Sequence, residues 1–346
     1  MELSDYLISE ESSLLEALEK LDLGGRKVLY VIHKNKLVAS ITDGDIRRWI
    51  LKKGDLNSPI SNIANYNPKF VYDSELDKVN HLMQKHSIES IPVLSESGEV
   101  KSIQFSDAII DKKEKIDATV VVMAGGLGTR LLPYTKILPK PLIPIGDKTI
   151  LERILNRFSE YEINDFKVVL NYKGNMIKSY FDDLNQYRIE FYFEADPLGT
   201  GGGLSLLKNR IPKAFFLTNC DILVNADYND IYNFHTKNNN FITMVTSIKS
   251  IEIPYGVINF DSKGTITSME EKPKLSRFLN TGFYVVNPKV IEDLKQEKID
   301  FTDIIEKYQK QGEKIGVYPI SENNWKDMGE MNLLNSLKKD FGDFDV

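Results

Sequence analysis

The sequence predicts an α/β protein in two parts: a repeated pair of small α/β units, followed by a larger domain with a mostly parallel, mixed sheet. The first part repeats itself, because a shift that places Leu14 on Leu76 also places Ile41 on Ile103. From about residue 118, short apolar runs alternate with helix-like segments, which is typical of a parallel sheet. The first of these runs, 119–123, is continuously apolar, as in a strand buried on both faces.

The composition limits the class of protein. A chain of 346 residues is long enough for two or three domains, and its hydrophobic (42%) and charged (27%) fractions exclude a mainly disordered protein. The net charge of −6 disfavours nucleic acid and anionic membranes as partners, so a phosphate site must be a local cationic pocket. With a polar N-terminus, no long apolar run and one cysteine, the sequence predicts a cytosolic protein without an intrachain disulfide.

Two units of similar pattern are expected in the first part, over residues 1–57 and 58–115. The apolar spacing in the first unit predicts a helix at 13–21, strands at 28–32 and 37–41, and a second helix that begins at Asp45. The spacing in the second unit predicts a helix at 75–86 and strands at 91–94 and 100–103. Units of this size bury little surface alone, so we expect the two to pack against each other.

Each unit ends in a short motif, ASITDGD at 39–45 and KSIQFSD at 101–107. These motifs resemble those of CBS units, two of which form a Bateman module. The resemblance implies that Thr42 and Asp45 hold the ribose of an adenine or related regulatory nucleotide, and that the chain forms a homo-oligomer through these units. In the second unit Gln104 replaces the hydroxyl residue. Alternatively, Asp45 and Asp107 only cap the helices that they precede.

The second domain is expected over residues 118–346, after a charged linker at 111–117. Its pattern predicts a helix at 149–160 and strands at 119–123, 166–170, 189–193 and 215–218. In such a sheet, ligands bind at the carboxyl ends of the strands. Later segments are expected to form an added β region that covers one side of the cleft, and they are 255–260, 265–269 and 280–286.

A glycine-rich turn and two cations follow the first strand of this domain. Three glycines allow the backbone to approach a ligand and to present N–H groups to phosphate oxygens: Gly125, Gly126 and Gly128. Arg130 comes next, and Lys140 stands between two prolines that fix its backbone. The turn is not a dinucleotide fingerprint, because Pro133 interrupts the required helix, and no Gly-Lys-Ser/Thr of a Walker loop is present. A polyanionic ligand is therefore predicted.

Two aspartates are candidate magnesium ligands. Asp221 directly follows the apolar strand 215–218, where a buried carboxylate is costly unless it is compensated. Magnesium favours one or two carboxylates with substrate oxygens and water, which suits Asp221 together with Asp327. Alternatively, Asp221 caps a helix and Asp327 belongs to a turn. Cys220 is expected to be a packed residue, and the four histidines show no ligand spacing.

Residues 120–151 resemble the signature of the sugar nucleotidyltransferases, the NDP-sugar pyrophosphorylases. Further segments follow in that family's order: EADPLGTGGGL at 194–204, TNCD at 218–221, EEKP at 270–273, NTGFY at 280–284 and WKDMG at 325–329. The match covers about residues 118–340. It implies a Rossmann-like nucleotidyltransferase domain after the CBS pair.

In that family, a sugar 1-phosphate oxygen attacks the α-phosphorus of a nucleoside triphosphate, and pyrophosphate leaves. Like charges at ~4 Å repel by about 4 kcal/mol per pair at an effective dielectric of 20, so charge neutralisation and positioning dominate. The resemblance implies that Arg130 and Lys140 are catalytic and that Asp221 and Asp327 hold Mg²⁺. The implied nucleotide site comprises Ala124, Gly125, Gly126, Gly128, Thr129, Glu194, Gly199, Thr200 and Gly201. The implied sugar-phosphate site comprises Gly256, Glu271, Lys272, Asn280 and Thr281.

Several alternatives stay open. Glu194 could be a surface charge, and the glycines at 199–202 could form a flexible loop. The order of the two parts is similar to that of guanylyltransferases of bacterial surface-sugar synthesis, including that of legionaminic acid, which implies GTP with glucosamine 1-phosphate. Mannose 1-phosphate with GTP, or glucose 1-phosphate with UTP or CTP, are other pairs. The rival classes are a nucleotide-sensing regulator without turnover and a glycosyltransferase, which usually has Asp-x-Asp where this chain has NCD at 219–221.

Overall fold

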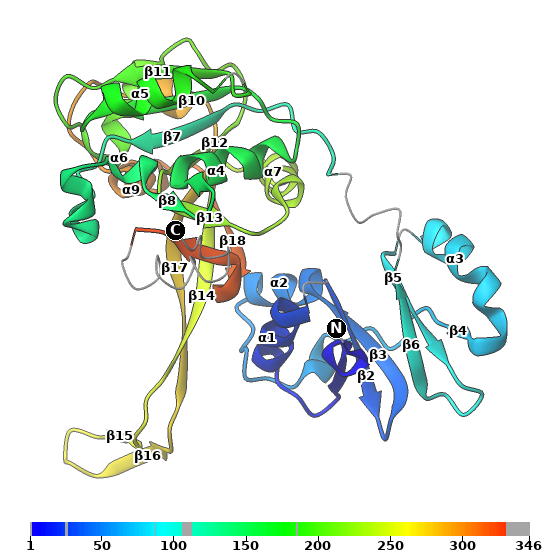
Figure 1. Cartoon of the computed structure of the whole chain (residues 1–346). Helices are drawn as coiled ribbons and strands as arrows, with labels where there is room; N and C mark the ends of the chain where they lie inside the picture. Colours follow the sequence, from blue (N-terminus) through cyan, green and yellow to red (C-terminus); the bar gives the residue numbers. More distant parts are fainter. Residues whose placement is uncertain (1, 25–26, 87, 106–112, 185, 330–346) are drawn as a thin grey trace. The chain divides into compact units, whose positions relative to one another are not determined.

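The computed structural model describes residues 2–24, 27–86, 88–105, 113–184 and 186–329 (Figure 1). By its internal contacts the chain divides into two units, Met1–Lys112 with Ser250–Arg277, and Lys113–Lys249 with Phe278–Val346. None of the helices in the described ranges has the length and apolar content that crossing a bilayer requires.

The N-terminal region contains two small sheets of the same topology. The first repeat comprises β1 (Leu7–Ser9), α1 (Leu14–Gly24), β2 (Val28–His33), β3 (Lys36–Thr42) and α2 (Asp43–Leu51). The second comprises β4 (Val71–Tyr72), α3 (Val79–His86), β5 (Ser90–Leu94) and β6 (Val100–Phe105). In both, the first strand is parallel to the second and the second is antiparallel to the third. The predicted repeat is therefore confirmed.

Three details of the repeats differ from the prediction or fall outside it. The second helix of the first repeat begins at Asp43 and not at Asp45, because Thr42 is its N-cap. The helix expected at 75–86 is an α-helix only from Val79, because a 3-10 helix occupies Asp73–Lys78. The helix expected after Asp107 lies outside the described residues.

The two repeats pack against each other, as expected for units with small cores. The hydroxyl groups of Tyr30 and Ser90, which are both buried, lie 2.8 Å apart. The ring centroids of Tyr6 and Phe105 are 5.0 Å apart. Burial raises the pKa of Tyr30 to about 12, so this contact stays uncharged at neutral pH.

The second unit is built on a seven-stranded sheet in the order β11-β10-β7-β12-β17-β14-β18. β7 is parallel to β10 and β12, β10 to β11, and β14 to β18, whereas β17 is antiparallel to β12. The strands are β7 (Val120–Ala124), β10 (Phe166–Leu170), β11 (Ile189–Phe193), β12 (Phe215–Asn219), β14 (Ile242–Glu252), β17 (Lys274–Val286) and β18 (Ile315–Ser321). The sheet is therefore mixed and mostly parallel, as predicted.

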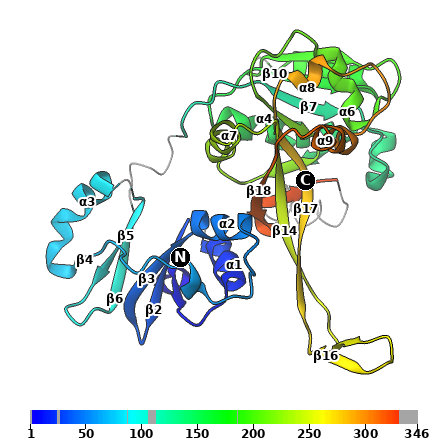
Figure 2. The same cartoon turned by 180° about the vertical axis from the view of Figure 1, so that it is seen from behind.

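Helices cover both faces of this sheet (Figures 1 and 2). Alternate residues of β7 take part in two separate cores, because successive side chains of a strand point to opposite faces. Val120 and Val122 belong to a core with α4 (Ile150–Ser159), α5 (Gly174–Asp182) and α7 (Tyr228–Lys237). Val121 and Met123 belong to a core with α8 (Lys289–Glu292) and α9 (Phe301–Lys310).

The prediction for the segments after residue 240 is partly wrong. Residues 280–286 do not form a separate β region, because they belong to β17, whose last four residues pair with β12 inside the main sheet. The sequence analysis missed β14, in which Thr and Ser interrupt the apolar residues, and β18, in which Gly316 and Pro319 weaken the strand pattern. The other two segments form a separate antiparallel hairpin of β15 (Val257–Phe260) and β16 (Ile266–Glu270).

Candidate active site

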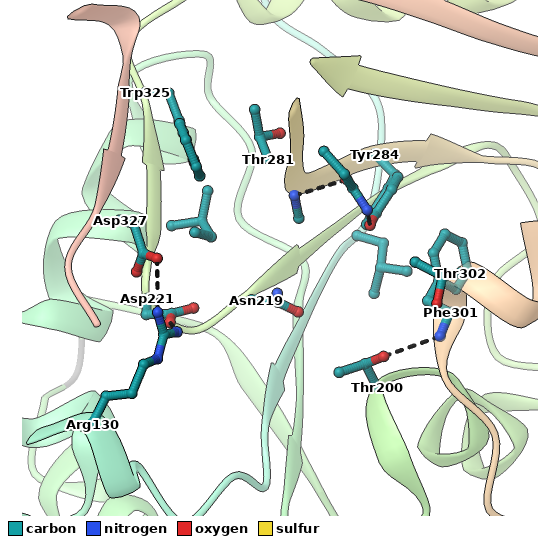
Figure 3. Close-up of a pocket in the computed structure, with 14 residues that line it drawn as sticks. Arg130, Thr200, Asn219, Asp221, Thr281, Tyr284, Phe301, Thr302, Trp325 and Asp327 are labelled. Atoms are coloured by element: carbon teal, nitrogen blue, oxygen red, sulfur yellow. Dashed lines mark hydrogen bonds and ion pairs between the residues drawn. The ribbon is translucent and has the colours of Figure 1, made fainter. Parts of the chain in front are cut away.

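The candidate active site of the second unit lies beyond the carboxyl ends of β7 and β12. Two cavities adjoin there, and Arg130, Thr200, Asn219 and Asp221 line both. The glycine-loop cavity, of about 330 Å³, is also lined by Gly125, Gly126, Gly128, Thr129, Lys140, Glu194, Gly199 and Asp300. The Tyr284 cavity, of about 300 Å³, is also lined by Asn280, Thr281, Gly282, Tyr284, Phe301, Thr302, Trp325 and Asp327 (Figure 3).

The glycine-rich turn after β7 leaves little room for a side chain at two of its three positions. A Cβ on Gly125 would lie 2.8 Å from Oε2 of Glu194. Gly128 has a φ of +66°, and a Cβ there would lie 2.8 Å from Cγ2 of Thr135. Gly126 has no atom within 4 Å of the place of a Cβ, so it leaves open space at the cavity. The turn therefore brings backbone close to the cavity, as a phosphate site needs.

Four charged side chains from distant segments meet where the two cavities join. Lys140, in the 3-10 helix Lys140–Leu142, forms an ion pair through Nζ with Oδ2 of Asp221. The guanidinium of Arg130 lies 3.5 Å from Oδ2 of Asp221 and 3.2 Å from Oδ2 of Asp327 (Figure 3). The exposed fractions of Lys140 and Asp221 are only 8% and 6%. Each buried charge thus has a partner of opposite sign.

A two-stranded sheet brings the two aspartates together. β13 (Ile222–Val224) is antiparallel to β19 (Trp325–Asp327), and Ile222 lies opposite Asp327. The N–H of Met328 donates to the carbonyl oxygen of Asp221 at 2.8 Å. Because β13 follows Asp221, the interpretation of Asp221 as a helix cap is wrong. Asp327 does accept the N–H of Gly329 at 2.8 Å, so it also stabilises a turn.

The donor set suits a magnesium ion. A Cβ on Gly329 would lie 2.3 Å from Nζ of Lys140, 2.6 Å from Oδ2 of Asp221 and 2.8 Å from Oδ1 of Asp327, so this glycine keeps the space between them free of a side chain. Within the described ranges no group of three or more His, Cys, Asp or Glu residues is arranged to hold a metal. Two carboxylates, completed by substrate oxygens and water, are the arrangement that Mg²⁺ accepts.

Glu194 is buried beside the glycine-rich turn and is not a surface charge. It is 8% exposed, and its Oε1 has no hydrogen-bond partner among the described residues. Burial raises the pKa of Glu194 to about 6, although a backbone hydrogen bond from Leu198 opposes the shift. A buried, unpaired carboxylate oxygen at the wall of a cavity is costly, unless a ligand supplies the missing donor.

The glycines after Glu194 form part of a helix, so the flexible-loop interpretation is wrong. The short helix α6 (Gly199–Gly202) packs against the segment before α9, and a Cβ on Gly199 would lie 2.7 Å from the carbonyl oxygen of Ile299. The N–H of Thr200 donates to Oδ1 of Asp300 at 3.1 Å. These contacts hold Thr200 and Asp300 at the rim of the glycine-loop cavity.

Polar groups of β17 line the Tyr284 cavity. Nδ2 of Asn280 donates to the hydroxyl of Tyr284 at 2.7 Å. The hydroxyl of Thr281 donates to the carbonyl oxygen of Val245 at 2.7 Å, so it mainly joins β17 to β14.

Not every residue expected at the site lines a cavity. Ala124 and Gly201 are buried but line neither cavity. Gly256, Glu271 and Lys272 belong to Ser250–Arg277, which groups with the first unit, and they are exposed. Their assignment to a sugar-phosphate site stays a prediction.

The sequence analysis missed several lining residues, among them Asp300, Thr302, Tyr284 and Trp325. Asp300 begins α9 with a capping box shared with Asp303, which is a signal for a helix start rather than for a ligand. Cys220 is buried as expected, although it also lines the glycine-loop cavity, and its burial raises the pKa of the thiol to about 12.

In the N-terminal region, Thr42 is the N-cap of α2, and Asp45, the third residue of this helix, completes the capping box. The N–H of Asp45 donates to the hydroxyl of Thr42 at 3.2 Å, and the N–H of Thr42 donates to Oδ2 of Asp45 at 2.9 Å. Asp45 also forms an ion pair with Arg48. The capping interpretation therefore accounts for both side chains, and their binding of a nucleotide stays a prediction.

The sheet is covered on both faces and carries a glycine-rich turn, two cations and two carboxylates at its strand ends, which is the arrangement of an α/β domain with a ligand site at the carboxyl ends of its strands. The chain belongs to the nucleotidyl transferase family, whose model matches residues 119–342.

This chain is similar in sequence to proteins from several organisms. The bifunctional protein GlmU of Methanococcus aeolicus is 30% identical over 220 residues, which are 61% of this chain and 51% of GlmU, so the chain spans about half of that relative. The D-glycero-alpha-D-manno-heptose 1-phosphate guanylyltransferase of Campylobacter jejuni is 30% identical over 194 residues, 55% of this chain and 86% of that protein.

A solved structure shares the fold of the second unit. The crystal structure of HddC from Yersinia pseudotuberculosis aligns over 65% of this chain and all of that chain, with a TM-score of 0.53 and 24% identity.

Proposed function

We propose that the second unit transfers a nucleotidyl group from a nucleoside triphosphate to a sugar 1-phosphate, which yields an NDP-sugar and pyrophosphate. The observation that carries this proposal is the pair of adjoining cavities that share Arg130 and Asp221. The glycine-loop cavity suits the nucleotide, and the Tyr284 cavity, with its polar and aromatic walls, suits a sugar. The reacting phosphates would then meet at the charged cluster between them.

The bond changes need no nucleophile from the protein. An oxygen of the sugar 1-phosphate forms a bond to the α-phosphorus, and the bond from that phosphorus to the bridging oxygen breaks, so that pyrophosphate leaves with the electron pair. Arg130, a planar fork, and Lys140, a compact charge, neutralise phosphate oxygens as charge shifts to the leaving group. Both cations pair with aspartates, which hold them in place before substrates bind.

We propose Asp221 and Asp327 as the ligands of a magnesium ion. When bound, Mg²⁺ supplies positive charge to the phosphates of the nucleotide. The test is a calorimetric titration with MgCl₂ and a non-hydrolysable triphosphate. Asp221→Asn is expected to weaken the magnesium dependence of nucleotide binding, and an unchanged titration would contradict the assignment.

Glu194 supports guanine as the base. Its carboxylate only accepts hydrogen bonds, and guanine presents two adjacent donors, N1–H and the 2-amino group. Uracil and thymine present one donor between two acceptors, which a carboxylate matches less well. The relative from C. jejuni is named as a guanylyltransferase. We therefore propose GTP as the triphosphate.

We keep glucosamine 1-phosphate, as in legionaminic acid synthesis, as the first sugar to test, and Gly256, Glu271 and Lys272 as sugar-phosphate contacts by motif. A screen of pyrophosphate release would pair GTP, ATP, UTP and CTP with the 1-phosphates of glucosamine, mannose, glucose and a heptose. Release with GTP is expected to be fastest. Binding of GTP without turnover of any pair would favour the rival nucleotide-sensing regulator.

Glu194→Gln tests the choice of base in the same screen. A glutamine offers one acceptor and one donor, so it pairs less well with guanine and better with uracil. The ratio of kcat/KM for GTP over UTP is expected to fall by at least ~10-fold, the scale of one lost hydrogen bond to a charged group. An unchanged ratio would remove Glu194 from base recognition.

We propose further that the N-terminal repeats are a CBS pair, in a cytosolic enzyme, that binds a regulatory adenine nucleotide near Thr42 and Asp45. Their shared topology and mutual packing support this. Calorimetry of the whole chain with AMP and ATP is the test, with Asp45→Asn as the variant. If AMP and ATP gave no binding heat, or if Asp45→Asn kept the binding heat of the wild type, this proposal would be contradicted. The transferase proposal would be unaffected.

A further inference from the structure

The segment Ser250–Arg277, which we call the arm, contains a two-stranded ribbon whose strands, among the described residues, pair only with each other. β15 and β16, yellow in Figures 1 and 2, form a sheet of two strands. Asp261 stabilises the turn between them, because its Oδ1 accepts the N–H groups of Lys263 at 2.8 Å and Thr265 at 2.9 Å. The ribbon is thus a defined element.

One face of the ribbon is apolar and exposed. Ile258 lies opposite Met269, and Phe260 lies opposite Ile266, with a register shift between the two pairs. Ile258 and Phe260 are two residues apart, so all four side chains share one face. Their exposed fractions are 48% for Ile258, 71% for Phe260, 61% for Ile266 and 69% for Met269.

The opposite face is mostly polar, which makes the ribbon amphipathic. Asn259 lies opposite Ser268, and its Nδ2 donates to the serine hydroxyl at 2.9 Å. Val257 lies opposite Glu270 on this face. A two-stranded ribbon is at best marginally stable in water by itself, and it gains stability when its apolar face is covered.

Charge and area indicate what covers this face. The arm has four acidic residues and four basic residues, so its net charge is zero in a chain whose net charge is −6. A neutral arm has no attraction for an anionic membrane or for nucleic acid. Two arms, by contrast, can approach without net repulsion. The four apolar side chains expose about 500 Å² together, so two copies would bury about 1,000 Å², which is the lower limit for a specific interface.

We propose that the apolar face of the arm packs against the same face of the arm in a second copy of this chain. The two ribbons would lie face to face about 10 Å apart, as two packed sheets do. Such a contact is isologous, since each copy contributes Ile258, Phe260, Ile266 and Met269, and it closes as a dimer. This pairing does not depend on nucleotidyl transfer.

The test compares the particle mass of the full chain with that of two variants, by light scattering after gel filtration at about 50 μM. Phe260→Lys with Met269→Lys places two charges on the apolar face, and the matched control, Asn259→Lys with Ser268→Lys, places two on the polar face. We expect the first variant to halve the mass and the control to keep it. A monomeric wild-type chain, or an apolar-face variant of unchanged mass, would overturn the proposal, as would a control that dissociates equally.

A cross-link distinguishes dissociation from misfolding. Cys220 is the sole cysteine of the chain and is buried, so Met269→Cys introduces one accessible thiol per chain. A bismaleimide with a reach of about 10 Å is expected to link Met269→Cys into a covalent dimer within minutes, because packed sheets lie farther apart than a disulfide spans, whereas Ser268→Cys should give much less. Equal cross-linking of the two variants, or none with Met269→Cys, would place the apolar face away from a second copy. Membrane or partner binding to a monomer would count against the proposal as well.

Discussion

Lys140 and Asp221 are buried together, so each depends on the other. An ammonium or carboxylate that is nine-tenths buried is costly when it is alone, and a partner of opposite sign offsets part of that cost. Arg130 adds a second positive charge 3.5 Å from the same carboxylate. In the absence of substrate, the cations of the cluster therefore balance the carboxylates that we propose as magnesium ligands.

Removal of either cation is expected to slow the reaction strongly. Arg130→Ala and Lys140→Ala should each lower kcat by at least 10²-fold, because one preorganised contact with transition-state charge is worth about 2.7–4 kcal/mol. Pyrophosphate release at saturating GTP and sugar phosphate is the measurement. Lys136→Ala is the control, since Lys136 is a cation of the same segment that lines neither cavity. Near-normal rates in either variant would refute the assigned roles.

Glu194 makes the stability of the ligand-free protein depend on pH. Its pKa is raised from 4.5 to about 6, so the protonated form is favoured in the folded state. The resulting stabilisation is complete below pH 4.5 and is lost as the pH rises through 6, to a total of about 2 kcal/mol.

Glu194→Gln removes this titration. Urea unfolding of the variant should therefore show a gain in stability relative to wild type that is larger at pH 8 than at pH 4.5. A stability difference that does not change between these pH values would show that the carboxyl group is solvated in the folded protein.

At the scale of elements, glycines decide how closely α6 and the segment before α9 approach. Gly199 has a φ of +78°, and the place of its Cβ is 2.7 Å from a backbone oxygen that cannot move aside easily. This contact sets Thr200 and Asp300 at the cavity rim. The glycines of α6 therefore allow close packing against α9 and the segment before it, and they do not form a flexible loop.

Gly199→Ala is expected to destabilise the protein by about 2–5 kcal/mol, the sum of left-handed backbone strain and overpacking. Gly312→Ala is the matched control, because Gly312 has a φ of +84° but nothing within 4 Å of its Cβ position. It should cost only about 1–2 kcal/mol. Chemical unfolding measures both, and equal losses would mean that the close approach to Ile299 is relieved in solution.

At the scale of the whole molecule, the chain has separate hydrophobic cores. Val71, Val79 and Ile91 belong to a core of the N-terminal region, whereas the cores on either side of the large sheet contain none of these residues. Units with their own cores can unfold independently.

Calorimetric unfolding of the full chain is expected to show two transitions. A non-hydrolysable GTP analogue with Mg²⁺, at 100 times the Kd of the analogue, should raise the unfolding temperature of the second unit only. Binding at this concentration adds ~2.7 kcal/mol to the free energy of unfolding of that unit. A single transition that the analogue shifts as a whole would show that the two units unfold cooperatively.

Some strands were predicted correctly from the sequence and others were missed, for physical reasons. The strands β10 and β11 agree with the predicted ranges residue for residue, because they carry uninterrupted or strongly β-favouring runs. β14 was missed because Thr and Ser interrupt its apolar pattern, and β18 because Gly316 and Pro319 weaken its strand pattern. Both strands form only by pairing with strands from elsewhere in the chain. The same limit applies to Asp300 and Trp325, which reach the cavities only through contacts between distant segments.

The sequence by itself determined the repeated N-terminal pattern, the parallel core of the large sheet and the residue types at its strand ends, because helix and strand periodicity and glycine or proline constraints act locally. Only the tertiary structure decided that β17 enters the main sheet, that Glu194 is buried, and that Asp327 meets Asp221 through the pairing of β13 with β19. These features depend on contacts between residues far apart in the chain, whose free energy is set by burial and by pairing of opposite charges, and no local pattern encodes them.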